Sequence, residues 1–333
     1  MDRNRGHAPG NEARALGLLI GACMVILGLS TATRAQEARP VIADYTVAKE
    51  AVLRSIPEQY IRAAKERLHI MYCGTSHSSQ VVDGLRGLME YKPGDAELYK
   101  VSFDGRAQPK ELDIDYRPNH PVKVYSEARD LSHDSMDAEG HTQYYRKTIE
   151  YLDHPDHAHV NVVMWSWCSI EGHDVQRYLD DFGELAALYR PGGAKGRTRA
   201  NAVVFVFMTG YARGDDADTP EPPYIKSPFQ NRQRIVDYCR RRGHLCLDYW
   251  SQDCYDYGTD AYHPDVNGNS NRIHLAYQQA HEQGQDWFVN RNFRSGEPKL
   301  PAHANNHITG NRRAYAAWWI WARLAGWPGR GAE

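Results

Sequence analysis

The sequence predicts an α/β fold in which a mainly parallel, five-stranded sheet carries helices on both faces. Short apolar runs alternate along the chain with longer segments whose apolar residues recur at helical spacing. The apolar runs are four to seven residues long, which suits strands that are buried between two helical layers. No internal repeat and no low-complexity linker divides this alternating pattern.

Five apolar runs provide the predicted strands, and six amphipathic segments provide the predicted helices. The strands are expected at residues 68–73, 98–103, 160–165, 202–208 and 245–248, of which the run at 202–208 is the most apolar. The helices are expected at residues 45–67, 78–90, 142–152, 174–189, 227–242 and 311–324. Five strands alternating with helices fit the flavodoxin-like doubly wound arrangement.

The first 35 residues are predicted to be a secretory signal peptide. A leader containing three arginines precedes a 14-residue apolar stretch from Leu16 to Leu29, and small residues precede a cleavage site after Ala35. An uncleaved anchor is the alternative interpretation. Cleavage would leave residues 36–333 as a single domain with long loops at 104–141 and 249–305. The protein is then expected to be secreted or periplasmic and not bound to a membrane.

Composition limits the classes of function. A formal net charge of −2 over 333 residues argues against a nucleic-acid partner, which favours a basic surface. A mean hydropathy of −0.68 excludes a polytopic membrane protein. Of the six cysteines, five lie after residue 35, and an exported chain would allow disulfides among them. Cys239 and Cys246 form the favoured pair.

The residues that follow the first predicted strand are candidates for catalysis, since parallel sheets bind ligands at the carboxyl ends of their strands. Gly74-Thr75-Ser76 stands between a strand and a helix. A serine in such a turn points outward, close to the backbone N–H groups at the start of the helix. This arrangement suits a nucleophile beside an oxyanion site. In the alternative interpretation, the serines here, Ser78 above all, only cap the next helix.

A second candidate segment precedes the last predicted helix. His307 stands where a side chain can reach back to the end of the first strand, and we expect it to act as general base for Ser76. His303 lies four residues earlier, so the two histidines can alternatively be metal ligands.

Acidic and aromatic residues interleave after the fifth predicted strand. Three of them, Trp250, Tyr255 and Tyr257, are candidates for a sugar-binding rim. A calcium loop and a solvated loop are the alternatives, and the spacing of an EF-hand is absent.

Taken together, these segments resemble the SGNH (GDSL-type) hydrolase superfamily, whose fold is a five-stranded doubly wound sheet. The resemblance implies that Ser76 is the nucleophile and that Gly105, after the second strand, donates to the oxyanion. It also implies that His307, in the segment His307-Ile308-Thr309-Gly310, is the base. Ser169, which follows the third strand, and His77 are the further candidates for oxyanion or substrate contacts.

The sequence departs from the pattern of the superfamily at three places. The asparagine that donates to the oxyanion after the third strand in this superfamily has no clear match in Cys168-Ser169-Ile170. Thr75 replaces the aspartate that usually precedes the nucleophile, and Ala304 stands three residues before His307, where an acid is usual. The histidine therefore lacks its usual orienting carboxylate.

The resulting expectation is an exported serine esterase or deacetylase that acts on an acylated saccharide or a related small-molecule or polysaccharide ester. This mechanism needs no cofactor and no metal. One alternative is a non-catalytic polysaccharide-binding protein on the same fold. The other is a metal-dependent hydrolase that uses His303, His307 and an acid such as Asp253.

Overall fold

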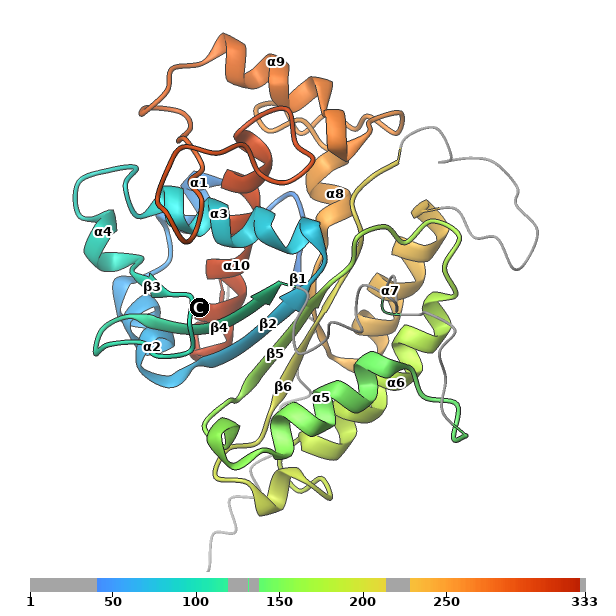
Figure 1. Ribbon diagram of the computed structural model, residues 1–333. Coiled ribbons are helices and arrows are strands. Elements are labelled where there is room, and N and C mark those ends of the chain that lie inside the picture. Colours follow the sequence, from blue (N-terminus) through green and yellow to red (C-terminus); the bar gives the residue numbers. More distant parts are fainter. Residues whose placement is uncertain (1–40, 119–130, 132–137, 214–227, 330–333) are drawn as a thin grey trace, which may run out of the picture. The chain divides into compact units, whose positions relative to one another are not determined.

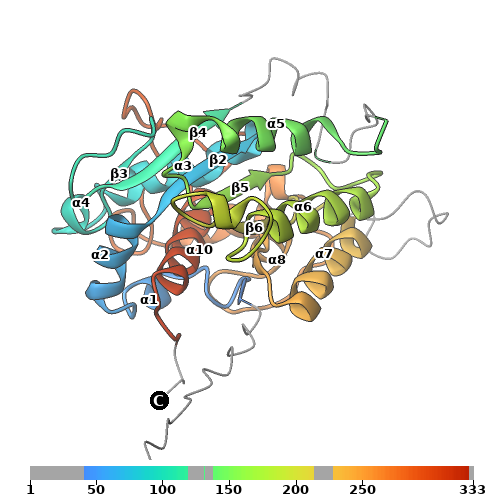
Figure 2. The ribbon, with the colours of Figure 1, turned by 90° about the horizontal axis from the view of Figure 1, so that it is seen from below.

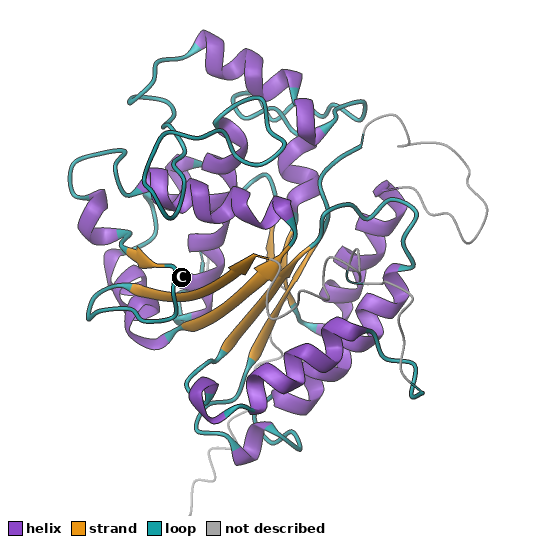
Figure 3. Ribbon diagram, viewed as in Figure 1, coloured by secondary structure: helices purple, strands orange, loops and turns teal. Residues whose placement is uncertain are grey.

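A seven-stranded parallel sheet forms the centre of the computed structural model, which describes residues 41–118, 131, 138–213 and 228–329 (Figures 1 and 3). The order of the strands across the sheet is β1-β7-β6-β5-β2-β4-β3, and every neighbouring pair is parallel. The strands are β1 (Val41–Ala43), β2 (His69–Gly74), β3 (Val101–Ser102), β4 (Leu112–Pro118), β5 (Val162–Ser166), β6 (Val204–Met208) and β7 (Leu245–Leu247). The predicted α/β class and parallel sheet are confirmed.

The predicted count of five strands is wrong, because β1 and β4 were not expected. β1 is only three residues long, too short to give a sequence signal. β4 lies inside the segment 104–141, which was predicted to be a loop. Its apolar residues Leu112, Ile114 and Tyr116 alternate with charged ones, which is the pattern of a strand with one polar face. Of the strand expected at residues 98–103, only Val101–Ser102 is extended, as β3 at the edge of the sheet.

Helices cover both faces of the sheet (Figures 1 and 2). They are α1 (Glu50–Leu53), α2 (Glu58–Arg67), α3 (Ser79–Leu88), α4 (Asp95–Leu98), α5 (Gln143–Asp153), α6 (Val175–Tyr189), α7 (Pro228–Arg242), α8 (Tyr249–Cys254), α9 (Arg272–Ala280) and α10 (Ile308–Leu324). Alternate strand residues point to opposite sides and so build two cores. Ile70 and Tyr72 join the core beneath α2, α3 and α10, whereas Met71 and Cys73 join the core beneath α5, α6 and α7.

Two of the expected segments are divided differently in the structure. The single helix expected at 45–67 is broken into α1 and α2, and Pro57 stands immediately before α2. Proline disfavours a helical conformation in the residue before it and has no N–H to donate, so the helix restarts at that point. The loop expected at 249–305 contains α8 and α9.

The direction in which the chain is wound reverses at β2. From β2 the chain passes to β3 and β4 on one side, and then crosses to β5 on the other side of β2. In open α/β sheets, ligands bind at the carboxyl ends of the strands where this reversal occurs. Gly74 ends β2 at this place, and a Cβ added there would lie 2.8 Å from the Cβ atoms of both Ser78 and Ser166. Only glycine allows the two strand ends to come so close.

Helices α3 and α10 pack directly against each other on one face of the sheet. A Cβ on Gly84 would overlap the carbonyl oxygen of Gly310, so the two backbones touch at this crossing. The crossing brings the amino-terminal end of α3 towards the segment that leads into α10.

The predicted signal peptide lies outside the described residues. Within the part of the chain that the structure describes, no helix is both long and apolar enough to cross a membrane. The expected Cys239–Cys246 disulfide is not formed, and all five cysteines after residue 35 are free thiols. Cys239 and Cys246 are both buried between α7 and β7, and burial, together with the neighbouring Cys239, raises the pKa of the Cys246 thiol.

We predict that Gly84→Ala lowers the free energy of unfolding by about 1–3 kcal/mol, because the added methyl group forces α3 and α10 apart. The matched control is Gly183→Ala in α6. There the new Cβ meets only the hydroxyl end of Tyr238, which can rotate away, and helix propensity improves by up to about 1 kcal/mol. Urea denaturation of both variants measures the difference. Equal stabilities would contradict the proposed close crossing.

Candidate functional site

Ser76 and His303 form a hydrogen-bonded pair at the carboxyl end of β2. Ser76 begins a single 3₁₀ turn, Ser76–Ser78, that connects β2 to α3. Its Oγ lies 2.7 Å from Nε2 of His303, and both residues are exposed to solvent. An accessible hydroxyl in contact with an imidazole nitrogen is the arrangement of a serine nucleophile and its base.

The histidine expected from the sequence to act as base, His307, is not the one that contacts Ser76 in the structure. Nδ1 of His307 accepts a hydrogen bond of 3.1 Å from the backbone N–H of Asn290, and its ring stacks on Trp287 at 5.6 Å. Burial lowers the pKa of His307 to about 4. His307 thus holds the segment 287–290 in place, while His303, singled out from the sequence only as a metal ligand, contacts the serine.

Contacts with α3 place His303 over Ser76. The buried carboxylate of Asp83 binds Nζ of Lys299 at 2.7 Å, and Nε2 of Gln80 donates a hydrogen bond of 2.9 Å to the carbonyl of Ala302. His303 itself adopts φ +61°, a left-handed conformation that is uncommon for a residue with a side chain. Such backbone strain persists only where surrounding contacts impose it. The loop is therefore fixed to the helix that carries the serine.

A stack of three rings supports the imidazole of His303. His77 lies between Tyr211 and His303, with ring centroids 4.5 Å and 4.8 Å away. His77 is only 1% exposed, and burial, with a smaller contribution from the charges of His303 and Arg313, lowers its pKa to about 4. His77 is therefore uncharged at neutral pH. Although the sequence pointed to His77 for contacts with the oxyanion or the substrate, in the structure its ring positions His303.

Asn269 is a polar group of the site that the sequence analysis missed. Its Oδ1 accepts a hydrogen bond of 2.8 Å from Nε2 of His77, the ring that stacks on His303. The residue lies in a 3₁₀ turn, Gly268–Ser270, within the segment predicted to be a long loop. No periodic pattern marks a single asparagine in such a segment, so only the folded chain reveals it.

No carboxylate contacts the imidazole of His303 among the described residues. Ser76 and the ring of His77 are its side-chain neighbours in the structure. The missing acid that the sequence indicated at Ala304 is thus not replaced by a carboxylate from another described loop. Within the described part of the chain, Ser76 and His303 thus form a dyad and not a triad.

Gly105 does not serve as the predicted oxyanion donor in this structure. Its N–H donates a hydrogen bond of 3.2 Å to the carbonyl of Ile114, within the turn between β3 and β4. Gly105 has φ +70°, which this turn requires. Ser169 lies in the connection between β5 and α6, and its Oγ accepts a hydrogen bond of 3.1 Å from the N–H of Glu171.

The three aromatic residues expected to form a rim are largely packed. Trp250 is 2% exposed, and the ring of Tyr255 stacks on Tyr45 at 3.6 Å. The hydroxyl of Tyr257 accepts a hydrogen bond of 3.2 Å from the N–H of Glu50. The prediction is wrong for Trp250, because α8 directs this side chain into the protein. This correction weakens the interpretation of the loop as a sugar-binding rim.

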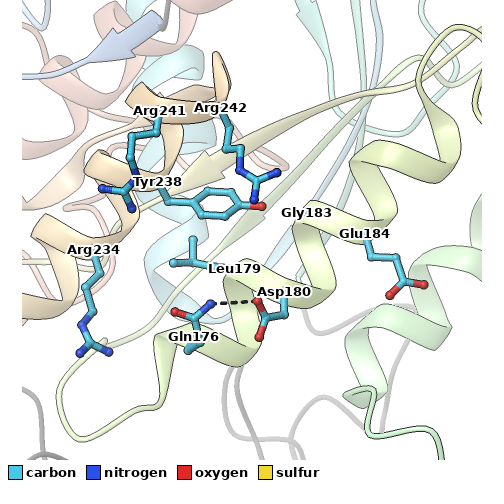
Figure 4. Close-up of a pocket in the computed structure, with 9 residues that line it drawn as sticks. All are labelled: Gln176, Leu179, Asp180, Gly183, Glu184, Arg234, Tyr238, Arg241 and Arg242. Atoms are coloured by element: carbon cyan, nitrogen blue, oxygen red, sulfur yellow. Dashed lines mark hydrogen bonds between the residues drawn. The ribbon is translucent and has the colours of Figure 1, made fainter.

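A surface groove of about 630 Å³ lies between α6 and α7, away from the dyad (Figure 4). Figure 4 shows Arg234, Arg241 and Arg242 of α7 along one side, and Asp180 and Glu184 of α6 on the other. Neither Ser76 nor His303 lines this groove.

The metal-site alternative based on His303 and His307 finds no support among the described residues. His307 accepts a hydrogen bond from Asn290, and the acid suggested to complete the site, Asp253, is buried in an ion pair with Arg313 at 2.6 Å.

Comparison of the chain with protein-family models, curated proteins and solved structures found no match. The geometry therefore carries the functional argument.

We predict that the protein loses stability as the pH falls from 7 to 5. His77 and His307 have pKa values of about 4 when folded, against 6.5 for an unperturbed histidine. In this range the unfolded chain binds more protons than the folded one, so the free energy of unfolding decreases as the pH falls. Urea denaturation at both pH values measures the loss.

The variant His307→Gln should show a smaller loss of stability between pH 7 and pH 5. The exposed His154→Gln serves as the matched control and should retain the loss seen in the original chain. An identical pH dependence in His307→Gln would contradict the lowered pKa of this group.

Proposed function

We propose that this chain is a serine hydrolase, an esterase or deacetylase, that acts on an acylated saccharide or a related ester. The observation that carries the proposal is the 2.7 Å contact between Oγ of Ser76 and Nε2 of His303. The pair stands where the winding of a parallel sheet reverses, the usual place for a ligand site in this class of fold.

The geometry supports acyl transfer in two steps. Oγ of Ser76 attacks the ester carbonyl while Nε2 of His303 takes the hydroxyl proton, which then passes to the leaving alcohol. Water deprotonated by the same nitrogen hydrolyses the acyl-enzyme and restores Ser76. Both side chains are exposed, so a bulky ester can reach them.

Donors for the developing oxyanion are available beside Ser76. A helical turn leaves its first N–H groups without intrahelical acceptors, so the turn that begins at Ser76 offers backbone donors. We propose the amide NH₂ of Asn269 as a further donor, since the oxygen of this amide is bonded to His77, the ring that stacks on His303. This set takes the place of the donor expected at Gly105.

The order of the strands supports the resemblance to the SGNH superfamily. The five central strands, β4-β2-β5-β6-β7, follow the order 2-1-3-4-5 when numbered along the chain, which is that of flavodoxin-like sheets. Ser76 follows the first of these strands, as a nucleophile of this superfamily does. The expected export through a signal peptide would place such an esterase outside the cytoplasm.

A serine–histidine pair that no described carboxylate contacts favours esters over amides. Aspartate in a triad orients the histidine and stabilises the imidazolium, and its loss can cost about 10⁴-fold in kcat. An ester has a better leaving group than an amide and places a smaller demand on the acid–base pair.

We predict that Ser76→Ala abolishes ester hydrolysis, with kcat lower by about 10³-fold or more. The fold should be preserved, because the Ser76 side chain is exposed and, among the described residues, its Oγ hydrogen-bonds only to His303. Turnover of p-nitrophenyl acetate and acetate release from an acetylated oligosaccharide measure the activity, and circular dichroism checks the fold. Unchanged turnover in a folded variant would refute the proposal.

We also predict that substitution of His303 lowers activity, whereas substitution of His307 lowers stability. His303→Asn should lower kcat by about 10²–10⁴-fold, and asparagine tolerates the left-handed backbone that this position requires. His307→Ala should keep most of the activity. It should lose about 1–3 kcal/mol of stability, because the N–H of Asn290 loses its acceptor. Loss of activity confined to His307→Ala would assign the base to that residue instead.

A further inference from the structure

Two histidines and an aspartate meet at the opposite end of the sheet from Ser76. His69 is the first residue of β2, Asp113 is its partner in register on β4, and His159 precedes β5. Nδ1 of His69 lies 2.9 Å from Oδ2 of Asp113, and Nε2 of His159 lies 3.9 Å from the same oxygen. All three residues can present ligand atoms within 4.8 Å of one another.

The backbone around this group is held by the sheet. Two hydrogen bonds join Asn161 to His69. The backbone N–H of Asn161 donates to the carbonyl of His69 at 3.0 Å, and Oδ1 of Asn161 accepts from the backbone N–H of His69 at 2.9 Å. Oδ1 of Asp113 accepts a hydrogen bond of 3.3 Å from the N–H of Ala107, which directs Oδ2 to the histidines. Two of the three residues, His69 and Asp113, thus stand on adjacent strands in a fixed register, and His159 lies in the connection just before β5.

The carboxylate of the group is buried, whereas the two imidazoles are partly exposed, so an ion can reach the site from solvent. Asp113 is 6% exposed, whereas the side chains of His69 and His159 are 38% and 42% exposed. A simple ion pair with Asp113 needs only one histidine. Here a second imidazole points at the same oxygen, too far away for a hydrogen bond, and its ring meets that of His69 edge to face at 5.2 Å.

We propose that His69, Asp113 and His159 bind one divalent transition-metal ion, of which Zn²⁺ is the best match. Two imidazoles and one carboxylate suit zinc, whereas calcium and magnesium prefer sites built from oxygen atoms. Bond lengths of about 2.0–2.2 Å to zinc place neighbouring ligand atoms a little over 3 Å apart. Rotation of the partly exposed His159 side chain supplies this adjustment. The fourth position faces solvent and takes water.

A metal at this place would join β2, β4 and the start of β5. Its binding energy would add to the stability of the folded chain, since the unfolded chain cannot bring the three ligands together. The site is separate from the dyad and does not depend on the proposed function.

The experiment uses the whole chain freed of any histidine tag and stripped with EDTA. Calorimetric titration with Zn²⁺ should give one equivalent bound, and Zn²⁺ should raise Tm. His159→Ala and His69→Ala should each weaken binding by at least about tenfold. His154→Ala, an exposed histidine in the same connection between α5 and β5, is the matched control and should bind as the original chain does.

Three results would overturn the site: no binding to the original chain, undiminished binding in His159→Ala, or equal loss in His154→Ala. Asp113→Asn provides a second test that keeps an acceptor for Ala107, and it too should bind weakly. Circular dichroism confirms the fold of each variant. Ester hydrolysis through Ser76 should stay unchanged in His159→Ala, so failure of this site and failure of the proposed function give different results.

Discussion

The close crossing of α3 and α10 is the constraint on which the candidate active site depends. Gly84 lets its helix approach the backbone of Gly310, where an added Cβ would overlap the Gly310 carbonyl oxygen. Because of this crossing, the turn before α3 and the segment before α10 meet at the carboxyl end of β2. The ion pair between Asp83 and Lys299 then fixes the loop to α3, which leaves His303 over Ser76.

Buried charges support the other side of the site. Arg313 of α10 pairs with Asp253 of α8 at 2.6 Å, and the second oxygen of Asp253 accepts a hydrogen bond of 3.1 Å from the N–H of Ala212. Gly268 packs against the same carboxylate, and a Cβ there would overlap it. This contact sets the turn that carries Asn269. One ion pair therefore positions both Asn269 and the segment that contains Tyr211, the two neighbours of His77.

Long apolar patterns made much of the fold predictable from the sequence. The histidine that contacts Ser76 was not predictable in this way. Strands β2, β5 and β6 and helices α6 and α7 bury continuous stripes, so their sequences specify them. Ser76 was singled out because a serine in a glycine turn is a local feature. Its hydrogen-bond partner was not, because His303 and His307 both precede the same helix. The choice between them depends on φ +61° at His303 and on tertiary contacts of Gln80 and Lys299.

For the proposed hydrolase, the ring stack explains how His303, which no described carboxylate contacts, can still act as a base. In the proposed attack by Ser76, positive charge would develop on His303, and a charged neighbour would oppose it. The pKa of His77 is held near 4, so at neutral pH the ring beneath His303 is uncharged. A cation over a neutral aromatic face is stabilised by about 0.5–1 kcal/mol at exposed sites. Burial of His77 between Tyr211 and His303 therefore supplies orientation and a small electrostatic gain, although less than an aspartate would.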